Sequence, residues 1–580
     1  MTRGRVLLPR VWALVLALLM LGPALAPGYV LSYDMVWVPD LALRGDFLGL
    51  GSGLPRAVPS DAVVAVLDEI IPGMVLQKLM LLGVLVLGGI GAARLTDPSS
   101  LAARLVAVTL YQWNPFVAER LVIGHWPVLI AYAALPWVIE GARDWRRSGR
   151  IPARLWFLVP LASLSASAGL TTAIALVAFA LVPLGNRALR RWVAVALLLA
   201  AANAPWLVAG LLHASTALTD PDGARLFGLR GEGSLPAPLA ALGLGGIWNA
   251  EVVPGSRTSP LAWVALVGVL VLVVGGIGEL GRRFGRRDTL ALACCWGVGW
   301  GLAVLTWALP DQMAWLVGHV PGAGLLRDGS RILALCAPLL AAAGGYGAAR
   351  LLSRLPEAAR PGLVIVLVLL PVATMPDAAF GISGRLSAAQ YPEDFSQARS
   401  VIDDQVDAGA DGDVLLLPFS SYRQPEWNDG HKVLDPVGRF LAPDFVASDE
   451  LLVSGRRVAG EDPLVREVTA VLARSTPDAR AAGLADLGIG FVVTEVAAGP
   501  APEVTGTTLL GGPDLLVQQL SRPSEAAVPS SWSVAVFGAW LAFASLLLGG
   551  LLDAARGLAR HGPRRPRAPA RDELSTDTAK

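Results

Sequence analysis

Carboxylate side chains lie where the first apolar run of the sequence ends. Asp34 closes that run and Asp40 follows six residues later. A carboxylate at a water-accessible edge of a membrane can act as general base for a hydroxyl group, or hold a divalent cation against a phosphate. The alternative for each residue is an ordinary interfacial aspartate whose charge is solvated. We therefore take Asp34 and Asp40 as the candidate catalytic residues.

Further polar side chains stand in the segment WNPFVAERLVIGHW, residues 113–126, between two apolar runs. The proline after Asn114 predicts a helix that begins there. Arg120 and His125 suit a phosphate, and Glu119 suits a hydroxyl group or a metal ion. The alternative is an ion pair between Glu119 and an arginine elsewhere in the chain. These four residues are candidate substrate-binding residues.

A third polar cluster is the segment GLLRDGSR, which places Arg327, Asp328 and Arg331 at the start of another apolar run. Two guanidinium groups around one carboxylate can clamp a phosphate by paired hydrogen bonds, although the same residues could cap a helix. The five histidines are scattered, and none pairs with another at metal-ligand spacing. We therefore predict no metal-ligand set of protein residues and no organic cofactor, with a bound divalent cation, Mg or Mn, left open.

The elements that must position these residues are membrane helices. Of the 580 residues 54% are hydrophobic and only 16% are charged, which indicates an integral membrane protein. A bilayer core of ~30 Å needs about 20 apolar residues per helix, and about twelve segments meet that criterion. Residues 155–184 are either one long kinked helix or two short helices that meet at the sequence SASAG. The three cysteines lie in apolar runs and indicate no disulfide framework.

Arginine-rich segments predict the orientation, because positive charge is retained on the cytoplasmic side. RDWRRSGR (143–150), RRFGRR (282–287) and the tail RHGPRRPRAPAR (560–571) follow alternate spans. Both termini are therefore predicted to be cytoplasmic. The membrane domain, residues 1–376, then has outward loops at 33–72, 112–126, 213–260 and 310–330. In the first of these, DAVVAVLDEII has the spacing of a helix that lies along the membrane interface.

Residues 377–530 have a different composition, with 11 Lys and Arg against 23 Asp and Glu. Short apolar runs at Asp413–Phe419, Ile489–Glu495 and Asp514–Leu520 predict strands, and FSQARSVIDDQV and LVREVTAVLAR predict helices. This stretch is expected to be a small extracytoplasmic α/β domain. The last transmembrane helix, 531–552, and a basic cytoplasmic tail, 553–580, expected to be disordered, follow it.

The whole arrangement resembles a known superfamily. An acidic residue after the first span, a long first outward loop with an interfacial helix, many further spans and a late soluble domain are similar to the GT-C membrane glycosyltransferases. The segments NPFVAERLVIGHW and LLRDGSR resemble the membrane region of actinobacterial cell-wall arabinofuranosyltransferases. The predicted fold class is an α-helical polytopic membrane protein, GT-C-like, with about 12 transmembrane helices, both termini inside, and the α/β domain inserted before the last helix.

The resemblance implies transfer of a sugar, arabinofuranose or mannose, from a polyprenyl-phosphate donor to a cell-wall or lipid-linked glycan acceptor at the outer face of the plasma membrane. Asp34 matches the family's acidic residue best and Asp40 second. The expected partners are the lipid donor, the glycan acceptor, membrane lipid and other cell-envelope proteins, with no nucleic acid. The alternatives are a transporter or flippase of lipid-linked sugars and a catalytically inactive scaffold of envelope assembly.

A transferase also makes geometric demands on the chain. Asp34, Glu119 and Arg327 should converge on one outward cavity that opens sideways to lipid. Trp113, Trp126 and Trp248 could offer faces on which a sugar stacks, although tryptophan at a membrane interface is usually an anchor.

Overall fold

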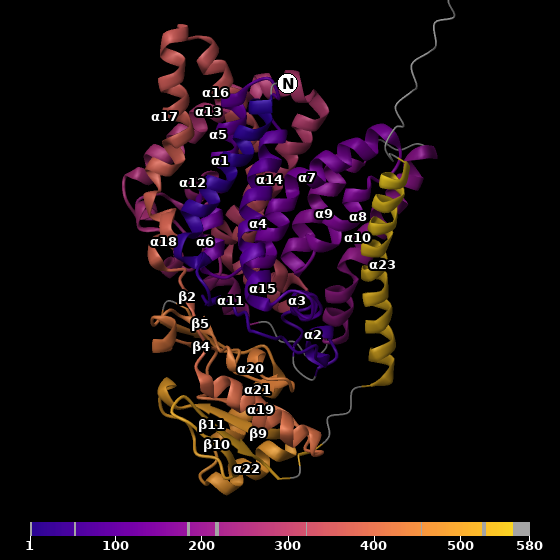
Figure 1. Cartoon of the computed structure of the whole chain (residues 1–580), viewed down its shortest axis with the longest axis vertical. Coiled ribbons are helices and arrows are strands. Elements are labelled where there is room, and N and C mark those ends of the chain that lie inside the picture. The colour runs from indigo at the N-terminus through magenta and orange to yellow at the C-terminus, as the bar shows by residue number, and fades with distance from the viewer. Residues whose placement is uncertain are drawn as a thin grey trace, which may run out of the picture.

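The computed structural model has a helical bundle at one end and a sheet-containing part at the other (Figure 1). It describes residues 3–51, 54–181, 186–214, 220–320, 322–453, 455–521, 523–524 and 529–560. We call the two ends of the bundle the sheet end and the basic end. The tail predicted to be disordered lies largely outside the described residues, and residues 52–53, 215–219 and 321 of the predicted loops also lie outside them.

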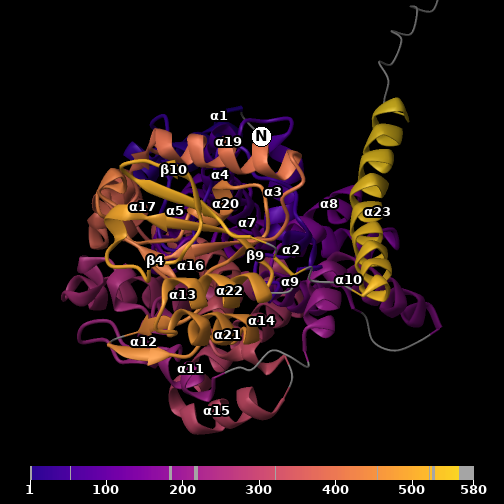
Figure 2. The ribbon, with the colours of Figure 1, turned by 90° about the horizontal axis from the view of Figure 1, so that it is seen from below.

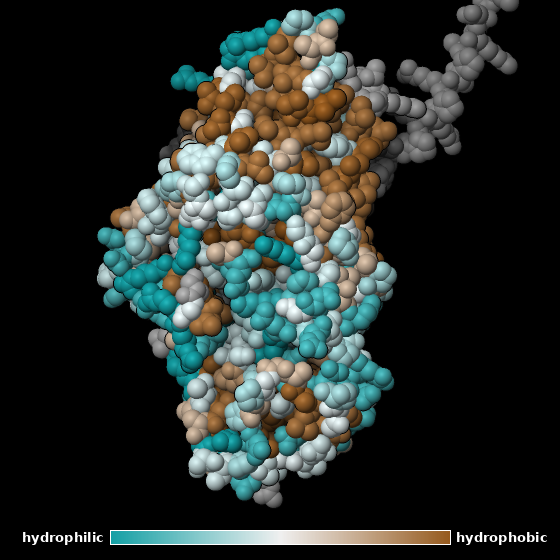
Figure 3. Space-filling view, turned by 90° about the vertical axis from the view of Figure 1, so that its left-hand side faces the viewer, coloured by the Kyte–Doolittle hydropathy of each residue, from teal (hydrophilic) through white to brown (hydrophobic). Residues whose placement is uncertain are grey.

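Eight helical segments within the described residues are long and apolar enough to cross a membrane. They are carried by α1 (Arg3–Leu21), α4 (Gly73–Arg94), α10 (Asn186–Leu212), α13 (Leu261–Phe284), α14 (Arg286–Ala308), η5 with α16 (Gly329–Cys336 and Ala337–Ser353), α17 (Arg360–Thr374) and α23 (Ser530–Arg560). The chain therefore has the make-up of a multi-pass membrane protein. The face that carries α17 is covered by hydrophobic residues over much of its upper half, as lipid contact requires (Figure 3).

Four more helices of the bundle fall on predicted spans. They are α5 (Leu101–Gln112), α7 (Trp126–Ser148), α8 (Ala153–Leu161) and α9 (Ala166–Ala180). At a rise of about 1.5 Å per residue, a helix as short as α5, α8 or α9 does not cross a ~30 Å core by itself. The predicted number of about twelve transmembrane helices is therefore not confirmed. Over residues 155–181, the described part of the range 155–184, the chain forms two helices and not one, because the helical pattern breaks between α8 and α9.

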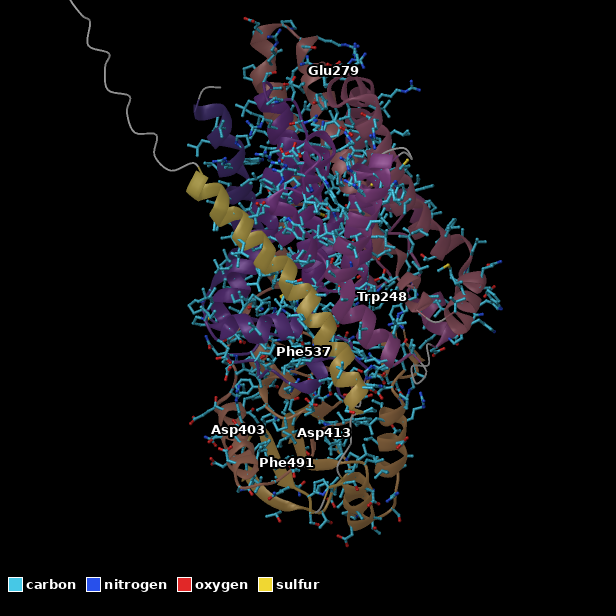
Figure 4. All side chains as sticks on the ribbon, turned by 90° about the vertical axis from the view of Figure 1, so that its right-hand side faces the viewer. Trp248, Glu279, Asp403, Asp413, Phe491 and Phe537 are labelled. Atoms are coloured by element: carbon cyan, nitrogen blue, oxygen red, sulfur yellow. The ribbon has the colours of Figure 1, made fainter. Side chains whose placement is uncertain are left out.

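The last helix, α23, stands at one edge of the bundle, where it packs against α8 and α10 (Figures 2 and 4). Its outer face carries Val534, Phe537 and Leu541, each at least 60% exposed. Such a row of exposed apolar side chains is costly in water and favourable in lipid, so α23 has the surface of a peripheral membrane helix.

Arginine-rich segments lie together at one end of the bundle, the basic end. Glu279 lies at the end opposite Asp403, Asp413 and Phe491 of the sheet-containing part (Figure 4). At that basic end, Arg143 and Arg146 of α7 both donate to the Asp288 carboxylate, at 2.7 and 2.6 Å. The arginine-rich segments around residues 143–150 and 282–287 are therefore neighbours, as a common membrane side requires. The cytoplasmic assignment of this end stays a prediction.

The sheet-containing part has a five-stranded mixed sheet in the order β10-β11-β9-β3-β6. Its strands are β3 (Asp413–Leu417), β6 (Phe445–Val446), β9 (Ile489–Glu495), β10 (Thr507–Gly511) and β11 (Leu515–Gln519). β3 pairs in parallel with β6 and β9, whereas β11 pairs antiparallel with β9 and β10. The three predicted strands correspond to β3, β9 and β11. The two-residue and three-residue strands β4 (Tyr422–Arg423), β5 (Val433–Leu434), β7 (Leu451–Val453) and β8 (Arg456–Val458) form two separate hairpins.

Helices cover both faces of this sheet (Figure 2). Side chains alternate along a strand, so Val414 and Leu416 pack in one core with Phe395 of α19 (Glu393–Asp407). Leu415 and Leu417 face the other way, into a second core with α21 (Pro463–Leu472) and α22 (Pro477–Asp486). The predicted helices correspond to α19 and α21. Burial of both faces explains why β3 is a continuous run of large apolar residues.

The first loop joins the bundle to the sheet-containing part. β1 (Tyr29–Val30) pairs antiparallel with β2 (Ala388–Ala389). Arg44 is buried and donates to the backbone oxygens of Gly438 and Pro443 at 2.7 and 3.0 Å. The predicted interfacial helix is α3 (Ser60–Asp68), whose Asp61 accepts from Arg439 at 2.7 Å. These contacts hold the two parts together at the sheet end.

The remaining short helices belong to the connecting loops. They are α2 (Gly45–Leu48), α6 (Pro115–Val122), α11 (Pro221–Leu226), α12 (Ala237–Leu242), α15 (Pro310–His319), α18 (Ala379–Gly384) and α20 (Val437–Phe440). Figure 1 places α2, α3, α11 and α15 at the sheet end of the bundle. Three of the four loops predicted on one membrane side therefore contribute helices to the same end of the structure.

Candidate functional site

Asp34 sits on a tight turn that is held by backbone contacts from both parts of the molecule. The Asp34 amide donates to the Ile123 carbonyl at 3.1 Å, and the Ser32 hydroxyl donates to the Val122 carbonyl at 2.6 Å. On the other side the Tyr33 amide donates to the Lys432 carbonyl at 2.7 Å. The turn is therefore wedged between the end of α6 and the strand β5.

Gly124 is required for this approach. It has φ +81°, and a Cβ atom built on it would lie 2.2 Å from the Met35 amide nitrogen and 2.7 Å from the Ser32 carbonyl oxygen. Both atoms belong to the turn that carries Asp34, so any larger residue must push the turn away.

We expect Gly124→Ala to lower the rate of the proposed reaction by about tenfold to a hundredfold, because a displacement of about 1 Å at a reacting group costs that much. The measurement is the initial rate in a transfer assay at equal protein amounts. Gly149→Ala is the matched control, since Gly149 has φ +75° with nothing within 4 Å of its built Cβ. If both variants lose the same activity, backbone strain and not the position of Asp34 is responsible.

His125 points its imidazole ring at Asp34. Its Nε2 atom lies 3.3 Å from Asp34 Oδ2, and its Nδ1 atom lies 2.8 Å from Arg120 Nη1. A guanidinium N–H can only donate, so Nδ1 accepts and Nε2 carries the hydrogen that faces Asp34. Burial lowers the pKa of His125 to about 4, and the positive charges of Arg331 and Arg120 contribute to that shift. His125 is therefore a neutral donor to the Asp34 carboxylate at pH 7.

Behind His125 lies a buried network of charges. Arg120 is 1% exposed, and its guanidinium lies 3.5 Å from Asp328 Oδ2 and donates to the Ser330 hydroxyl. Asp328 also accepts from Arg331 at 3.0 Å. Burial alone would raise the pKa of Asp328, but Arg120 and Arg331 outweigh it and lower the pKa to about 2. Asp328 is therefore ionised and fixes both arginines around His125.

Arg331 is the member of this network that reaches toward solvent. Its side chain is 36% exposed, and its Nη2 atom lies 3.3 Å from His125 Nε2. Both atoms carry hydrogen, so this contact is an approach of positive charge and not a hydrogen bond. A half-exposed guanidinium beside Asp34 can bind a phosphate at the same place where Asp34 meets a hydroxyl group.

Tyr422 of β4 completes the surroundings of Asp34. Its hydroxyl donates to Asp34 Oδ1 at 2.6 Å, although 388 residues separate the two in sequence. Burial raises the pKa of Asp34, but the hydrogen bonds from His125 and Tyr422 and the charge of Arg331 outweigh it, so the pKa lies below its usual value. The Asp34 side chain remains 40% exposed. It is thus an ionised carboxylate with an open side.

We expect Tyr422→Phe to shift the acid limb of the rate profile to higher pH by roughly 0.5–1 unit. The hydrogen bond from Tyr422 stabilises the charged carboxylate and lowers its pKa, so its loss raises that pKa. A base acts only when deprotonated, so activity then falls away at a higher pH than in the native protein. The measurement is kcat/KM between about pH 4 and pH 8, and a profile without displacement would contradict the role given to Tyr422.

Several predicted site residues contact partners other than Asp34. Asp40 is 60% exposed and pairs with Arg399 of α19 at 2.6 Å. Arg327 pairs with Glu461 of the sheet-containing part. Asn114 caps α6, accepts from the Val117 amide at 3.1 Å, and donates to the Leu110 and Tyr111 carbonyls and the Tyr132 hydroxyl. Both the oxygen and the nitrogen of the Asn114 amide therefore make hydrogen bonds within the protein.

Glu119 belongs to a second buried group. It is 2% exposed and lies against the carboxylate of Glu232, which accepts from Arg257 at 2.7 Å. Burial raises the pKa of Glu119 well above its usual value, and the neighbouring Glu232 raises it further. The ion pair with an arginine in this group is made by Glu232 with Arg257, and Glu119 lies beside that pair. Among the described residues, Glu119 and Arg327 contact Glu232 and Glu461 and not Asp34, so the expected convergence of the three is not seen.

The tryptophans expected to stack on sugar are engaged with protein. Trp113 is 2% exposed and donates to the Met375 carbonyl at 2.9 Å, and Trp126 packs against Trp37 at 5.3 Å between ring centroids. Trp248 meets Phe227 edge-on at 4.6 Å. Trp113 and Trp126 therefore have no open ring face for a sugar, because hydrophobic burial of a large ring outweighs its exposure for a ligand.

Sequence spacing could have suggested Ser330 and Tyr33, which adjoin predicted residues. Nothing in the sequence marks Tyr422, since its contact with Asp34 depends on how the two parts dock. Among the described residues, no group of three or more His, Cys, Asp or Glu side chains is placed to hold a metal ion. A cation would therefore need ligands from a substrate, such as phosphate oxygens, beside Asp34.

The similarity of this chain to known proteins is seen in its fold. No protein-family model and no curated protein sequence matches the chain. A solved structure of the arabinofuranosyltransferase AftD from mycobacteria matches 91% of this chain with a TM-score of 0.53 at 15% identity. The chain has the fold of that enzyme's matched part. It spans only 40% of the other chain, and a variant of AftD matches similarly, with a TM-score of 0.51 at 15% identity over 90% of this chain and 42% of that one.

The match confirms, for the fold alone, the predicted resemblance to an arabinofuranosyltransferase. Because the alignment covers 91% of the chain, it includes both the bundle and most of the sheet-containing part. At 15% identity the likeness concerns the architecture, and the chemistry has to be argued from the side chains around Asp34.

Proposed function

We propose that this chain is a membrane glycosyltransferase. It moves a sugar, arabinofuranose or mannose, from a polyprenyl-phosphate donor to a hydroxyl group of a cell-wall or lipid-linked glycan. The fold of the mycobacterial arabinofuranosyltransferase supports the reaction class. The sequence-based orientation places the sheet end, and with it Asp34, on the outer face of the plasma membrane.

In the proposed mechanism Asp34 acts as general base. The acceptor hydroxyl lies against the open side of the carboxylate, and Asp34 takes its proton while the acceptor oxygen attacks the anomeric carbon of the donor sugar. The bond between that carbon and the phosphate oxygen breaks at the same time. A single displacement inverts the configuration at the anomeric carbon. The proton ends on Asp34, and the new glycosidic bond replaces the bond to phosphate.

Arg331 stabilises the departing polyprenyl phosphate. The leaving group gains negative charge, and a half-exposed guanidinium next to the base can hold that charge where it develops. Arg120 is too deeply buried to touch a substrate, so it positions His125 and does not bind phosphate itself. Asp328 and Ser330 hold Arg120 and Arg331 in turn.

One observation carries the proposal. An ionised and partly exposed carboxylate, Asp34, receives hydrogen bonds from neutral His125 and from Tyr422, with the Arg331 guanidinium against the same imidazole. A purely structural aspartate has no need for an open side, nor for a nearby positive charge with which it does not pair. The reaction needs a base for the attacking hydroxyl group and a positive charge for the departing phosphate, and Asp34 and Arg331 supply the two side by side.

The test supplies purified protein in lipid nanodiscs with radiolabelled polyprenyl-phosphate arabinose or mannose and a glycan acceptor from the cell envelope. We expect label in the glycan from one of the two donors. Movement of the intact labelled lipid between leaflets of proteoliposomes, without label in glycan, would favour a flippase. Absence of both activities with every donor would favour the scaffold. A chelator added to the same assay tests whether Mg or Mn takes part.

A further inference from the structure

A pocket separate from the surroundings of Asp34 lies between helices of the bundle. It is lined mainly by apolar side chains from α5, α13, α16 and α17, including Leu110, Ala265, Leu266, Val269, Leu340 and Leu370. Apolar clefts between the helices of a bundle are frequent sites of apolar ligands. The polar lining of this pocket includes Arg257, Asn114 and Thr374.

The helices that wall this pocket face lipid on their other sides. α13 exposes Val264, Val267 and Val271 by 51%, 54% and 62%, and α17 exposes Ile365 and Val366 by 59% and 57%. The face of the molecule on which α17 lies has the broad hydrophobic surface of Figure 3. Since both helices are candidate membrane spans, the nearest source of an apolar occupant is the bilayer itself.

The polar end of the pocket is a buried guanidinium group. Arg257 precedes α13, is 3% exposed, and donates through Nε to Glu232 Oε2 at 2.7 Å. Its Nη2 atom has no hydrogen-bond partner within the part of the chain that the structure describes. A Cβ built on Gly243, which also lines the pocket, would lie 3.7 Å from Nη2. The unpaired Nη2 atom of Arg257 therefore lies beside the lining of the pocket.

Charge decides what this donor can bind. The charge of Arg257 is already balanced by the Glu232 carboxylate at 2.7 Å, and Glu119 lies against that same carboxylate. A phosphate would bring an uncompensated negative charge into a buried apolar site, which is costly. A neutral oxygen acceptor satisfies the N–H without that cost. The Asn114 amide is used by the cap of α6, and Thr374 donates its hydroxyl to backbone oxygens of its own helix.

We propose that the pocket binds one acyl chain of a membrane glycerophospholipid, with the ester carbonyl oxygen of that chain accepting a hydrogen bond from Arg257 Nη2. The apolar walls receive the hydrocarbon, and the guanidinium marks where the chain ends. Both Arg257 and Thr374 lie at the sheet-end termini of their helices, so the lipid belongs to the leaflet on that side. The site takes part in no sugar transfer and does not depend on the proposed function.

The experiment places the full chain in nanodiscs of phosphatidylcholine doped with a phosphatidylcholine whose acyl chain carries a diazirine. Irradiation and peptide mass spectrometry should find label on pocket-lining residues of α13 and α17. Ala265→Trp fills the pocket and should lower that labelling about tenfold. Val267→Trp adds the same ring to the lipid-facing side of the same helix and should leave it unchanged.

A second arm leaves the protein intact and changes the lipid. The ether-linked analogue lacks the ester carbonyl and should label the pocket about tenfold less, as expected for loss of a hydrogen bond to a charged donor. Equal labelling by ether and ester lipids, or unchanged labelling of Ala265→Trp, overturns the proposal. Displacement of the probe by polyprenyl phosphate at lower concentration than by phosphatidylcholine also overturns it, in favour of an isoprenoid occupant. Because the readout is binding, none of these results bears on sugar transfer.

Discussion

Asp34→Asn is expected to lower the rate of sugar transfer by about 10²–10⁴-fold, the contribution of a general base in a displacement. Asparagine keeps the size of the side chain and can still accept a hydrogen bond from Tyr422, so the fold should be unchanged. It cannot take the proton of the acceptor hydroxyl. The measurement is label transferred from the polyprenyl-phosphate donor, with binding of the donor measured in parallel.

Asp40→Asn is the matched control, because Asp40 is an exposed carboxylate of the same loop that pairs with Arg399. An exposed ion pair contributes little, so we expect its transfer rate to stay within about twofold of the native rate. Should Asp40→Asn be the inactive variant while Asp34→Asn works normally, the base has been assigned to the wrong residue. Full transfer by both variants would leave the chain without the proposed base.

Arg120→Met is the second variant with a large expected effect. It removes a buried charge that faces Asp328 and the Nδ1 atom of His125. Asp328 then keeps Arg331 as its cationic partner but loses the buried one, and breaking a buried pair costs up to about 3–5 kcal/mol of stability. His125 also loses the donor that decides its tautomer, so Nε2 no longer always presents a hydrogen to Asp34. We expect a lower unfolding temperature and a fall in transfer of about 10²-fold.

Two further variants separate these effects. Arg94→Met removes an arginine of the bundle whose partner, Glu140, lies at 2.6 Å in a half-exposed pair, and it should change stability by less than about 1 kcal/mol. Arg120→Lys keeps the charge but lacks the fork that reaches both His125 and Ser330. It should regain part of the stability and little of the transfer. The account of Arg120 is wrong if Arg120→Met is as stable as Arg94→Met.

Much of the architecture could be predicted because it follows from local properties of the chain. An apolar window of membrane length is a helix in lipid whatever surrounds it, since its backbone has no other partner there. The strands β3, β9 and β11 were visible for a similar reason, as short apolar runs between turn residues. The number of spans was harder, because α5, α8 and α9 are short helices that pack against neighbours and read like fragments of longer ones.

The residues around Asp34 could be predicted only by type. Arg120, His125, Asp328 and Arg331 were chosen because charge is costly near a membrane, and the structure brings all four together with Asp34. The same reasoning selected Arg327, which pairs elsewhere. The free-energy cost of burying a charge indicates which side chains need a partner, but it does not identify that partner.

By itself the sequence determined a multi-pass helical protein, with its arginine-rich segments at one end of the bundle and its candidate site residues in other loops. Hydrophobicity and charge act over single segments, so they can be read without knowing the fold. Only the tertiary structure decided that Tyr422 reaches Asp34, that Glu119 joins Glu232 and Arg257, and that Asp40 stays outside. Such contacts join residues hundreds of positions apart, and their energies exist only after the helices and the sheet have docked.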